Sequence, residues 1–143
     1  MKEISIQMID RRISSDWWKK IVKYFVQVGD GLEIRFWKEE ADEIKQASIY
    51  GNPTDENYEV SIKGVVSEQL ILELLSEKPK DRSIYNKMTK YFTVNIERGG
   101  LKFCSAHYGT EMYFVGVSDD DIAFFKNVMK EYTEEDFSIH ICE

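Results

Sequence analysis

Three consecutive aspartates, Asp119, Asp120 and Asp121, stand directly before an apolar run in the segment SDDDIAFF. Carboxylate oxygens are the ligands that Ca²⁺ and Mg²⁺ prefer in proteins. A cation site needs oxygens that converge from several directions, whereas consecutive side chains in the first turn of a helix point apart, and no DxDxDG loop surrounds these residues. The pattern therefore favours a helix start over a metal site.

Ser118 has the spacing of a helix N-cap. It stands three residues before Asp121, so its hydroxyl can accept from the Asp121 amide while the Asp121 carboxylate accepts from the backbone of Ser118. Val117 and Ile122 occupy the two positions of a hydrophobic staple, and the helix dipole favours negative charge in the first turn. The sequence predicts a helix that begins at Ser118.

Cys104, His107, His140 and Cys142 have the residue types of a Cys2His2 zinc site. In an alternating strand, Cys104 and His107 point to opposite faces whereas His140 and Cys142 share one face, so four ligands do not converge. A nucleophilic pair of Cys104 with His140 stays open, because such partners meet in space. We favour a buried, inert Cys104 and predict no metal, no cofactor and no catalytic residue.

No other chemistry is marked by a motif. The chain lacks GxxxxGK[ST], GxGxxG, HExxH and GxSxG, which disfavours a phosphate-binding loop and the nucleophile elbow. It has 26 Asp and Glu residues, and no spacing isolates two of them as an acid and base pair. The sequence therefore leans toward a protein that is not an enzyme.

The net charge of −7 lies entirely in the last 33 residues. From residue 1 to 110, 17 acidic and 17 basic residues cancel, whereas from 111 to 143 nine acidic residues face two lysines. We expect the helix from Ser118 and the turn TEED after it to present one negative surface. Such a surface steers a basic protein partner, with aromatic side chains as anchors; the alternative is a solvated surface that keeps the protein soluble. The predicted contact residues are Asp119, Asp120, Asp121, Tyr132, Glu134, Glu135 and Asp136.

Trp37 is the remaining candidate contact residue. If Phe36 points into the core of a strand, Trp37 points outward and contributes to an interface or lies under another element. Trp17 and Trp18 are adjacent on a predicted helix, about 100 degrees apart, so we expect core packing rather than an aromatic ligand cage.

Apolar periodicity predicts three helices, over 17–29, 67–78 and from 118 onward. The first has Ser14, Ser15 and Asp16 as cap residues and Val28 on its apolar face, and Pro79 marks the exit of the second. Residues 38–47 stay open between a hairpin and a short helix. Strands are predicted around 4–8, 32–36, 44–50, 58–62, 91–98, 101–108, 111–117 and 137–142.

The predicted order is roughly β-α-β-β-β-α-β-β-β-α-β. Hairpins cluster at Gly99-Gly100 and Gly109-Thr110. This arrangement favours a single α+β domain, residues 1–143, in which a largely antiparallel sheet of about six to eight strands packs against three helices.

Composition excludes several classes of function. A pI near 5.0 disfavours nucleic acid as a partner, although the segment 78–102 is basic. The longest apolar stretches, such as LILELL, are far shorter than the roughly 20 residues of a membrane span, and the N-terminal residues have no signal-peptide pattern. We therefore expect a cytoplasmic protein with reduced thiols at its two cysteines and no membrane partner.

Small size, acidity, segregated charge and many aromatic residues together resemble the profile of bacterial immunity proteins, which neutralise a cognate toxin by occluding it. The resemblance concerns general character and rests on no motif. It implies a non-enzymatic inhibitor that binds a basic toxin, for example a nuclease, through its carboxylates. The alternatives are a small enzyme that uses Cys104 or a His–carboxylate pair, and an oligomeric structural subunit that buries Trp37; the sequence leaves the oligomeric state open.

Overall fold

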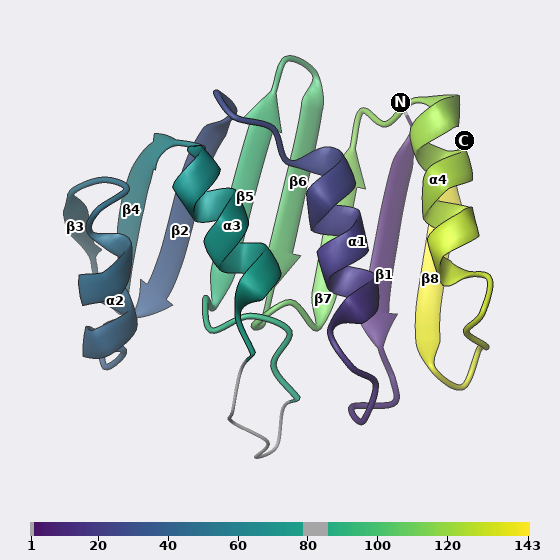
Figure 1. Ribbon diagram of the computed structural model, residues 1–143, viewed down its shortest axis with the longest axis horizontal. Helices are drawn as coiled ribbons and strands as arrows, with labels where there is room; N and C mark the ends of the chain where they lie inside the picture. The colour runs from purple at the N-terminus through teal and green to yellow at the C-terminus, as the bar shows by residue number, and fades with distance from the viewer. Residues whose placement is uncertain (1, 79–85) are drawn as a thin grey trace.

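The computed structural model, which describes residues 2–78 and 86–143, contains one eight-stranded antiparallel sheet with four helices on one of its faces (Figure 1). The strand order across the sheet is β3-β4-β2-β5-β6-β7-β1-β8. The elements are β1 (Glu3–Met8), α1 (Asp16–Phe25), β2 (Gly31–Trp37), α2 (Ala41–Ala47), β3 (Pro53–Glu56), β4 (Glu59–Val65), α3 (Glu68–Ser76), β5 (Thr93–Arg98), β6 (Leu101–Ala106), β7 (Glu111–Val115), α4 (Asp119–Met129) and β8 (Phe137–Cys142).

The sheet confirms the predicted α+β class. Every neighbouring pair of strands is antiparallel. Tight hairpins join β3 to β4 and β5 to β6 to β7, while β1 lies between β7 and β8, so the first strand pairs with the last two. The number of helices differs from the prediction, since the structure has four helices rather than three.

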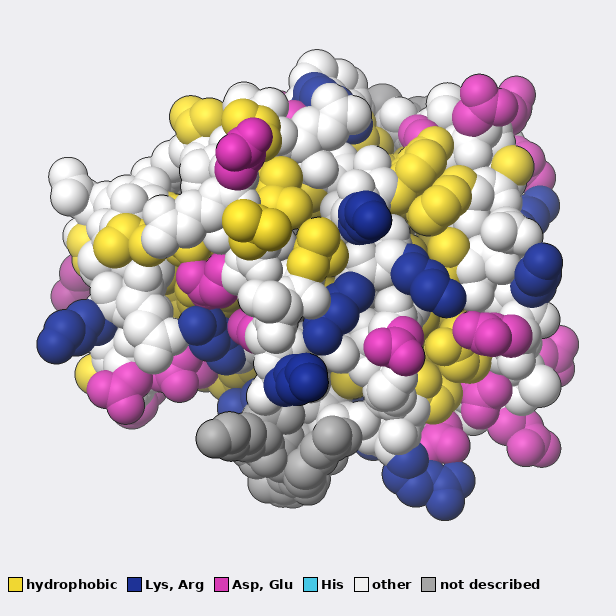
Figure 2. All heavy atoms as spheres, in the orientation of Figure 1, with side chains coloured by type: hydrophobic (Ala, Val, Ile, Leu, Met, Phe, Trp, Pro, Cys, Tyr) yellow, Lys and Arg dark blue, Asp and Glu magenta, His cyan; other side chains and the backbone are white. Residues whose placement is uncertain are grey.

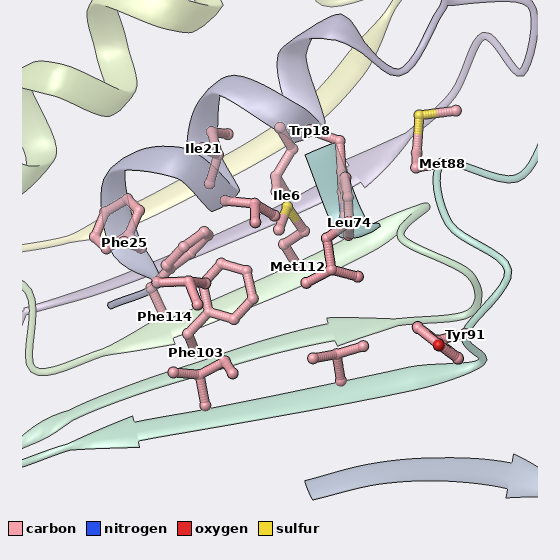
Figure 3. Packing of buried hydrophobic residues seen from close by; sticks show 14 of the residues in the cluster. Ile6, Trp18, Ile21, Phe25, Leu74, Met88, Tyr91, Phe103, Met112 and Phe114 are labelled. Carbon is pink, nitrogen blue, oxygen red and sulfur yellow. The ribbon is translucent and has the colours of Figure 1, made fainter. Parts of the chain in front are cut away.

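The core fills the space between one face of the sheet and the helices. Alternate residues of each central strand point to this side, and α1 buries all its apolar residues except Tyr24 against them. Phe25 of α1 lies over Phe114 and Phe103 of the sheet, with ring centroids 4.8 Å apart for Phe25 and Phe114 (Figure 3). This contiguous apolar cluster is what holds helices and sheet together.

Trp17 and Trp18 are both core residues, each 1% exposed. The Trp18 indole donates a hydrogen bond to the hydroxyl of Ser105, with 3.1 Å between Nε1 and Oγ. Gly109 lies against the same indole, because a Cβ atom there would be 2.7 Å from Trp18 Nε1 and from Met88 Cβ, and its φ of +84° suits glycine. The close approach explains why the β6–β7 hairpin has glycine at this point.

Two segments between residues 38 and 56 differ from the prediction. Residues 41–47 form helix α2, which settles the open choice between hairpin and helix, and the strand predicted over 44–50 is wrong. Ala47 at the end of α2 is fully buried, so the helix is held by packing. Strand β3 was not predicted, because it begins with proline and carries only polar residues, a composition that suits an edge strand.

Helix α1 is shorter than its apolar pattern suggests. It ends at Phe25, Val26 is extended, and Val28 is exposed rather than on the apolar face. The buried carboxylate of Asp30 accepts from the backbone N–H of Gln27 at 2.8 Å and pairs with Arg98 at 2.9 Å. These contacts stabilise a loop where another helical turn was predicted.

Two of the three predicted helix starts have side-chain caps. Ser118 and Asp121 form the predicted capping box of α4, at 3.1 and 2.9 Å, and Ser67 accepts from the Leu70 amide in α3. Ser15 makes no such bond at the start of α1. The end of the second predicted helix, expected at Pro79, lies outside the described residues.

Among the residues that the structure describes, none of the helices has the length and apolar character needed to cross a membrane.

Candidate functional site

The face of the sheet opposite the helices is the candidate site, and we call it the uncovered face. No helix lies on it among the described residues (Figure 1). Strand pairing aligns one row of side chains across seven strands of this face. In spatial order the row consists of Lys63, Glu33, Asn95, Cys104, Tyr113, Ser5 and His140.

Arg35 organises one half of the uncovered face. Its guanidinium lies 3.0 Å from Glu33, 2.7 Å from Glu56 and 3.1 Å from Glu59, so it joins strands β2, β3 and β4. The Glu33 carboxylate also accepts from Ser61 at 2.6 Å and from Asn95 at 3.2 Å. These bonds fix the positions of the carboxylates before any partner arrives.

The pKa shifts of Glu33 and Arg35 favour the charged form of each group. Burial by itself raises the pKa of Glu33, but hydrogen bonds from Ser61, Asn95 and Arg35 outweigh it and hold that pKa below its usual value. Burial likewise opposes the charge on Arg35, whereas the three glutamates raise the pKa of its guanidinium. Glu33 and Arg35 are therefore both charged at neutral pH.

A second cluster surrounds Glu111 on the other half of the face. Its carboxylate accepts from Gln7 at 3.1 Å and from the Tyr113 hydroxyl at 2.9 Å, and His107 Nδ1 lies 3.0 Å from it. The hydrogen bond to Glu111 raises the pKa of Tyr113, with burial as a further cause. His107 and Glu111 thus form the kind of His–carboxylate pair that the enzyme alternative requires. The His107 side chain is half exposed.

A shallow hollow of about 530 Å³ lies beside the two clusters, over the strand ends that carry Gly31, Glu97 and Lys102. Its lining includes Glu33, Asn95 and Cys104 together with Lys63 and Lys102. The hollow mixes charges of both signs with half-buried polar groups. It therefore suits complementary polar contacts with another surface.

Cys104 is a poor nucleophile in this environment. Burial raises the pKa of its thiol to about 11, and the charges of Glu111 and Glu33 act in the same direction. His140 lies on β8, three strand spacings or about 14 Å from β6, so the open pairing of Cys104 with His140 is wrong. The same separation keeps Cys104 and Cys142 apart, and both are free.

We expect alkylation by iodoacetamide to discriminate strongly between the two cysteines. A thiol with a pKa of about 11 has a roughly hundredfold smaller thiolate fraction at neutral pH than one at the reference value of 9.0. Cys142 is exposed, so it should react fully before Cys104 does. Peptide mass spectrometry over a time course measures both rates. Faster modification of Cys104 than of Cys142 would restore Cys104 as a catalytic candidate.

The predicted aspartates of α4 are partly engaged within the chain. Asp119 forms an ion pair with Lys2, and Asp121 accepts from the Ser118 backbone and from the Tyr24 hydroxyl. Asp120 is exposed. The capping interpretation of this segment is thus confirmed for Ser118 and Asp121.

The predicted acidic residues do not form one cluster. Asp119, Asp120 and Asp121 occupy the first turn of α4, whereas Glu134, Glu135 and Asp136 follow its last turn, so the length of an 11-residue helix, about 16 Å, separates the two groups. Asp136 accepts from the Thr133 amide at 2.9 Å, while Glu134 and Glu135 are exposed. Tyr132 is half-buried, with its ring 5.1 Å from that of Phe137.

Trp37 lies far from these carboxylates. It is 41% exposed at the end of β2 on the uncovered face, five strand spacings or about 24 Å from β8. Its ring is 5.0 Å from that of Phe92, which also contacts Tyr108 and His107. The structure therefore groups Trp37 with the uncovered face.

Of the predicted contact residues, only Trp37 lies on the uncovered face, and the sequence does not mark the polar residues around it. Glu33, Arg35, Asn95 and Tyr113 stand at the outward positions of alternating strands, where polar residues are ordinary. A usable sequence signal is that these outward positions carry polar or amphipathic residues in β2, β5 and β7. Only the strand order shows that they are neighbours.

Comparisons with protein-family models, with curated proteins and with solved structures each found no match to this chain.

Proposed function

We propose that this chain is a non-enzymatic binding domain that docks a basic protein on the uncovered face of its sheet. The observation that carries the proposal is the one-sided fold, in which four helices cover one face and none of the described helices covers the other. Antiparallel sheets commonly leave one face in solvent, so exposure alone is ordinary. The size, charge and aromatic content of this face support a binding role.

The uncovered face has the area of a protein interface. Seven spacings between eight strands span about 34 Å, and strands of about six residues are about 20 Å long, which gives roughly 700 Å². A standard protein–protein interface buries about 800 Å² on each partner. A flat surface of this size suits another protein better than a small substrate.

The charge of the face favours a basic partner. Strand alternation and pairing assign six carboxylates and three basic side chains to it, a balance of −3. They are Glu3, Glu33, Glu56, Glu59, Glu97 and Glu111 against Arg35, Lys63 and Lys102. Trp37 and Tyr113, 41% and 45% exposed, supply the aromatic anchors that dominate interface energetics.

The acidic residues near the C-terminus have a different role in this proposal. Asp120, Glu134 and Glu135 are exposed and concentrate negative charge around α4, on the helix-covered side. Such charges raise the rate of encounter with a basic protein without being buried in the complex. The specific form that we propose is inhibition of a basic toxin, such as a nuclease, in the cytoplasm. In this form the carboxylates of the inhibitor take the place of the phosphate groups that the nuclease would bind.

Affinity capture from a lysate of the source organism tests the proposal. The protein is used as bait, washed in parallel at low and high salt, and the retained proteins are identified by mass. We expect one basic protein bound one to one, with weaker retention at high salt because surface charge attraction is screened. Absence of a retained partner under both washes would contradict the binding role.

Size-exclusion chromatography with light scattering, run on the protein alone, measures its oligomeric state and so tests the alternative of an oligomeric subunit. A dimer whose formation is abolished by Trp37→Ala would replace the basic partner with a second copy of the chain. The enzyme alternative would require the His107–Glu111 pair. His107→Ala removes this pair and is therefore the variant that tests whether any activity depends on it.

A further inference from the structure

A groove between α1 and α4 lies on the opposite side of the molecule from the uncovered face. The groove has a volume of about 640 Å³, within the range of small-molecule sites. Its floor contains Tyr24 and Phe124, whose rings stack with centroids 3.9 Å apart and planes 8° apart, together with the buried side of Val128. The floor is therefore flat, apolar and built from both helices.

Three lysines line this groove. Lys20 and Lys23 come from α1, and Lys130 follows α4. Among the described residues, Glu131 is the one carboxylate in the lining, so the charge of the described lining is +2 in a chain whose net charge is −7. Figure 2 shows dark blue basic side chains beside yellow apolar ones in the region between α1 and α4.

Lys20, Lys23 and Lys130 have no competing partner in the part of the chain that the structure describes. Within residues 2–78 and 86–143, none of the three forms an ion pair or a side-chain hydrogen bond. Lys2 and Lys90, by contrast, pair with Asp119 and Glu73. Three unpaired ammonium groups around an apolar floor are complementary to a molecule with one anionic end and an apolar body.

We propose that the α1–α4 groove binds a small amphipathic carboxylate, a free molecule with a linear or aromatic apolar body. The length of the groove limits the occupant: Phe124 to Glu131 covers about two helical turns, roughly 10 Å. An amphipathic peptide helix needs several turns to bury its apolar face in a groove, whereas a medium-chain carboxylate fits this length. The site is independent of the uncovered face, because α1 and α4 lie on the other side of the sheet.

Isothermal titration calorimetry with decanoate tests this proposal. We expect one decanoate to bind per chain, and expect the triple variant Lys20→Gln, Lys23→Gln, Lys130→Gln to bind about tenfold more weakly because the ammonium groups no longer attract the carboxylate. Decan-1-ol, which lacks the charge, should likewise bind about tenfold more weakly to the unmodified protein. Exposed lysine to glutamine changes leave the core untouched, so loss of folding does not confuse the result.

Lys126→Gln is the matched control. Lys126 is an exposed lysine of α4 outside the groove lining, so its replacement should leave decanoate affinity unchanged within about twofold. Three results would overturn the proposal: no heat of binding with decanoate, equal affinity in the triple variant, or retention on phosphatidylglycerol vesicles without binding of free decanoate. The last result would identify a membrane surface as the source of the anion.

Discussion

Trp18→Ala is expected to lower the free energy of unfolding by about 4 kcal/mol. The Trp18 side chain is 1% exposed, points from α1 toward the sheet, and donates a hydrogen bond to the buried hydroxyl of Ser105. Its removal leaves a large cavity between α1 and the β6–β7 hairpin and deprives Ser105 of its donor. Urea denaturation followed by far-UV circular dichroism measures the change.

Trp17→Phe and Trp18→Phe form a matched control pair. Both replacements remove the same atoms from indoles that are 1% exposed. The Trp17 indole nitrogen has no hydrogen-bond partner among the described residues, whereas that of Trp18 bonds to Ser105. We expect Trp18→Phe to cost about 1 to 2 kcal/mol more than Trp17→Phe. Equal costs would show that the Trp18–Ser105 bond contributes nothing, and a mild effect of Trp18→Ala would contradict the core role.

Arg35→Ala is expected to lower the free energy of unfolding by about 2 kcal/mol at pH 7. The guanidinium holds Glu33, Glu56 and Glu59 together, and without it three carboxylates on adjacent strands repel one another. The guanidinium is partly exposed, so the cost lies between those of a surface pair and a buried pair. Thermal denaturation of the variant measures it.

The sign of the pH dependence follows from the pKa of Glu33, which folding lowers. A lowered carboxyl pKa contributes stability that is present above the unfolded value and is lost as pH falls through the folded value. The difference between Arg35→Ala and the unmodified protein should therefore shrink as pH falls below about 4.5. Arg35→Lys keeps the charge without the planar fork and should cost less than Arg35→Ala. A pH-independent difference would contradict an electrostatic cause.

Local patterns predict most of the helices and strands, because the apolar–polar alternation of a strand and the apolar spacing of a helix depend on only a few neighbouring residues. The strand Ile4–Met8 and the cap at Ser118 illustrate this, since each depends on its own segment. Helix α2 was left open because its apolar content is small and its end is held by the distant packing of Ala47. Edge strand β3 was missed because backbone pairing with β4, rather than side-chain burial, creates it.

The candidate site was less predictable than the fold. Charge counting correctly locates the acidic surplus near the C-terminus, but it assigns no position in space, and the length of α4 separates Asp120 from Glu135 in the turn that follows the helix. The uncovered face depends on β1 pairing between β7 and β8, a contact between the two ends of the chain. Long-range pairing of this kind leaves no local sequence signal.

The most direct test of the uncovered face compares binding kinetics of two charge-matched variants with the captured partner. Glu3→Lys with Glu97→Lys alters exposed positions of the uncovered face, and Asp120→Lys with Glu135→Lys makes the same charge change around α4. Contact residues govern dissociation, whereas peripheral charges govern association. Surface plasmon resonance at low salt measures both rates.

We predict that Glu3→Lys with Glu97→Lys raises the dissociation rate by about tenfold or more, and that Asp120→Lys with Glu135→Lys slows association severalfold with dissociation unchanged. The opposite pattern, faster dissociation only in the variant altered around α4, would contradict the account and place the interface at α4.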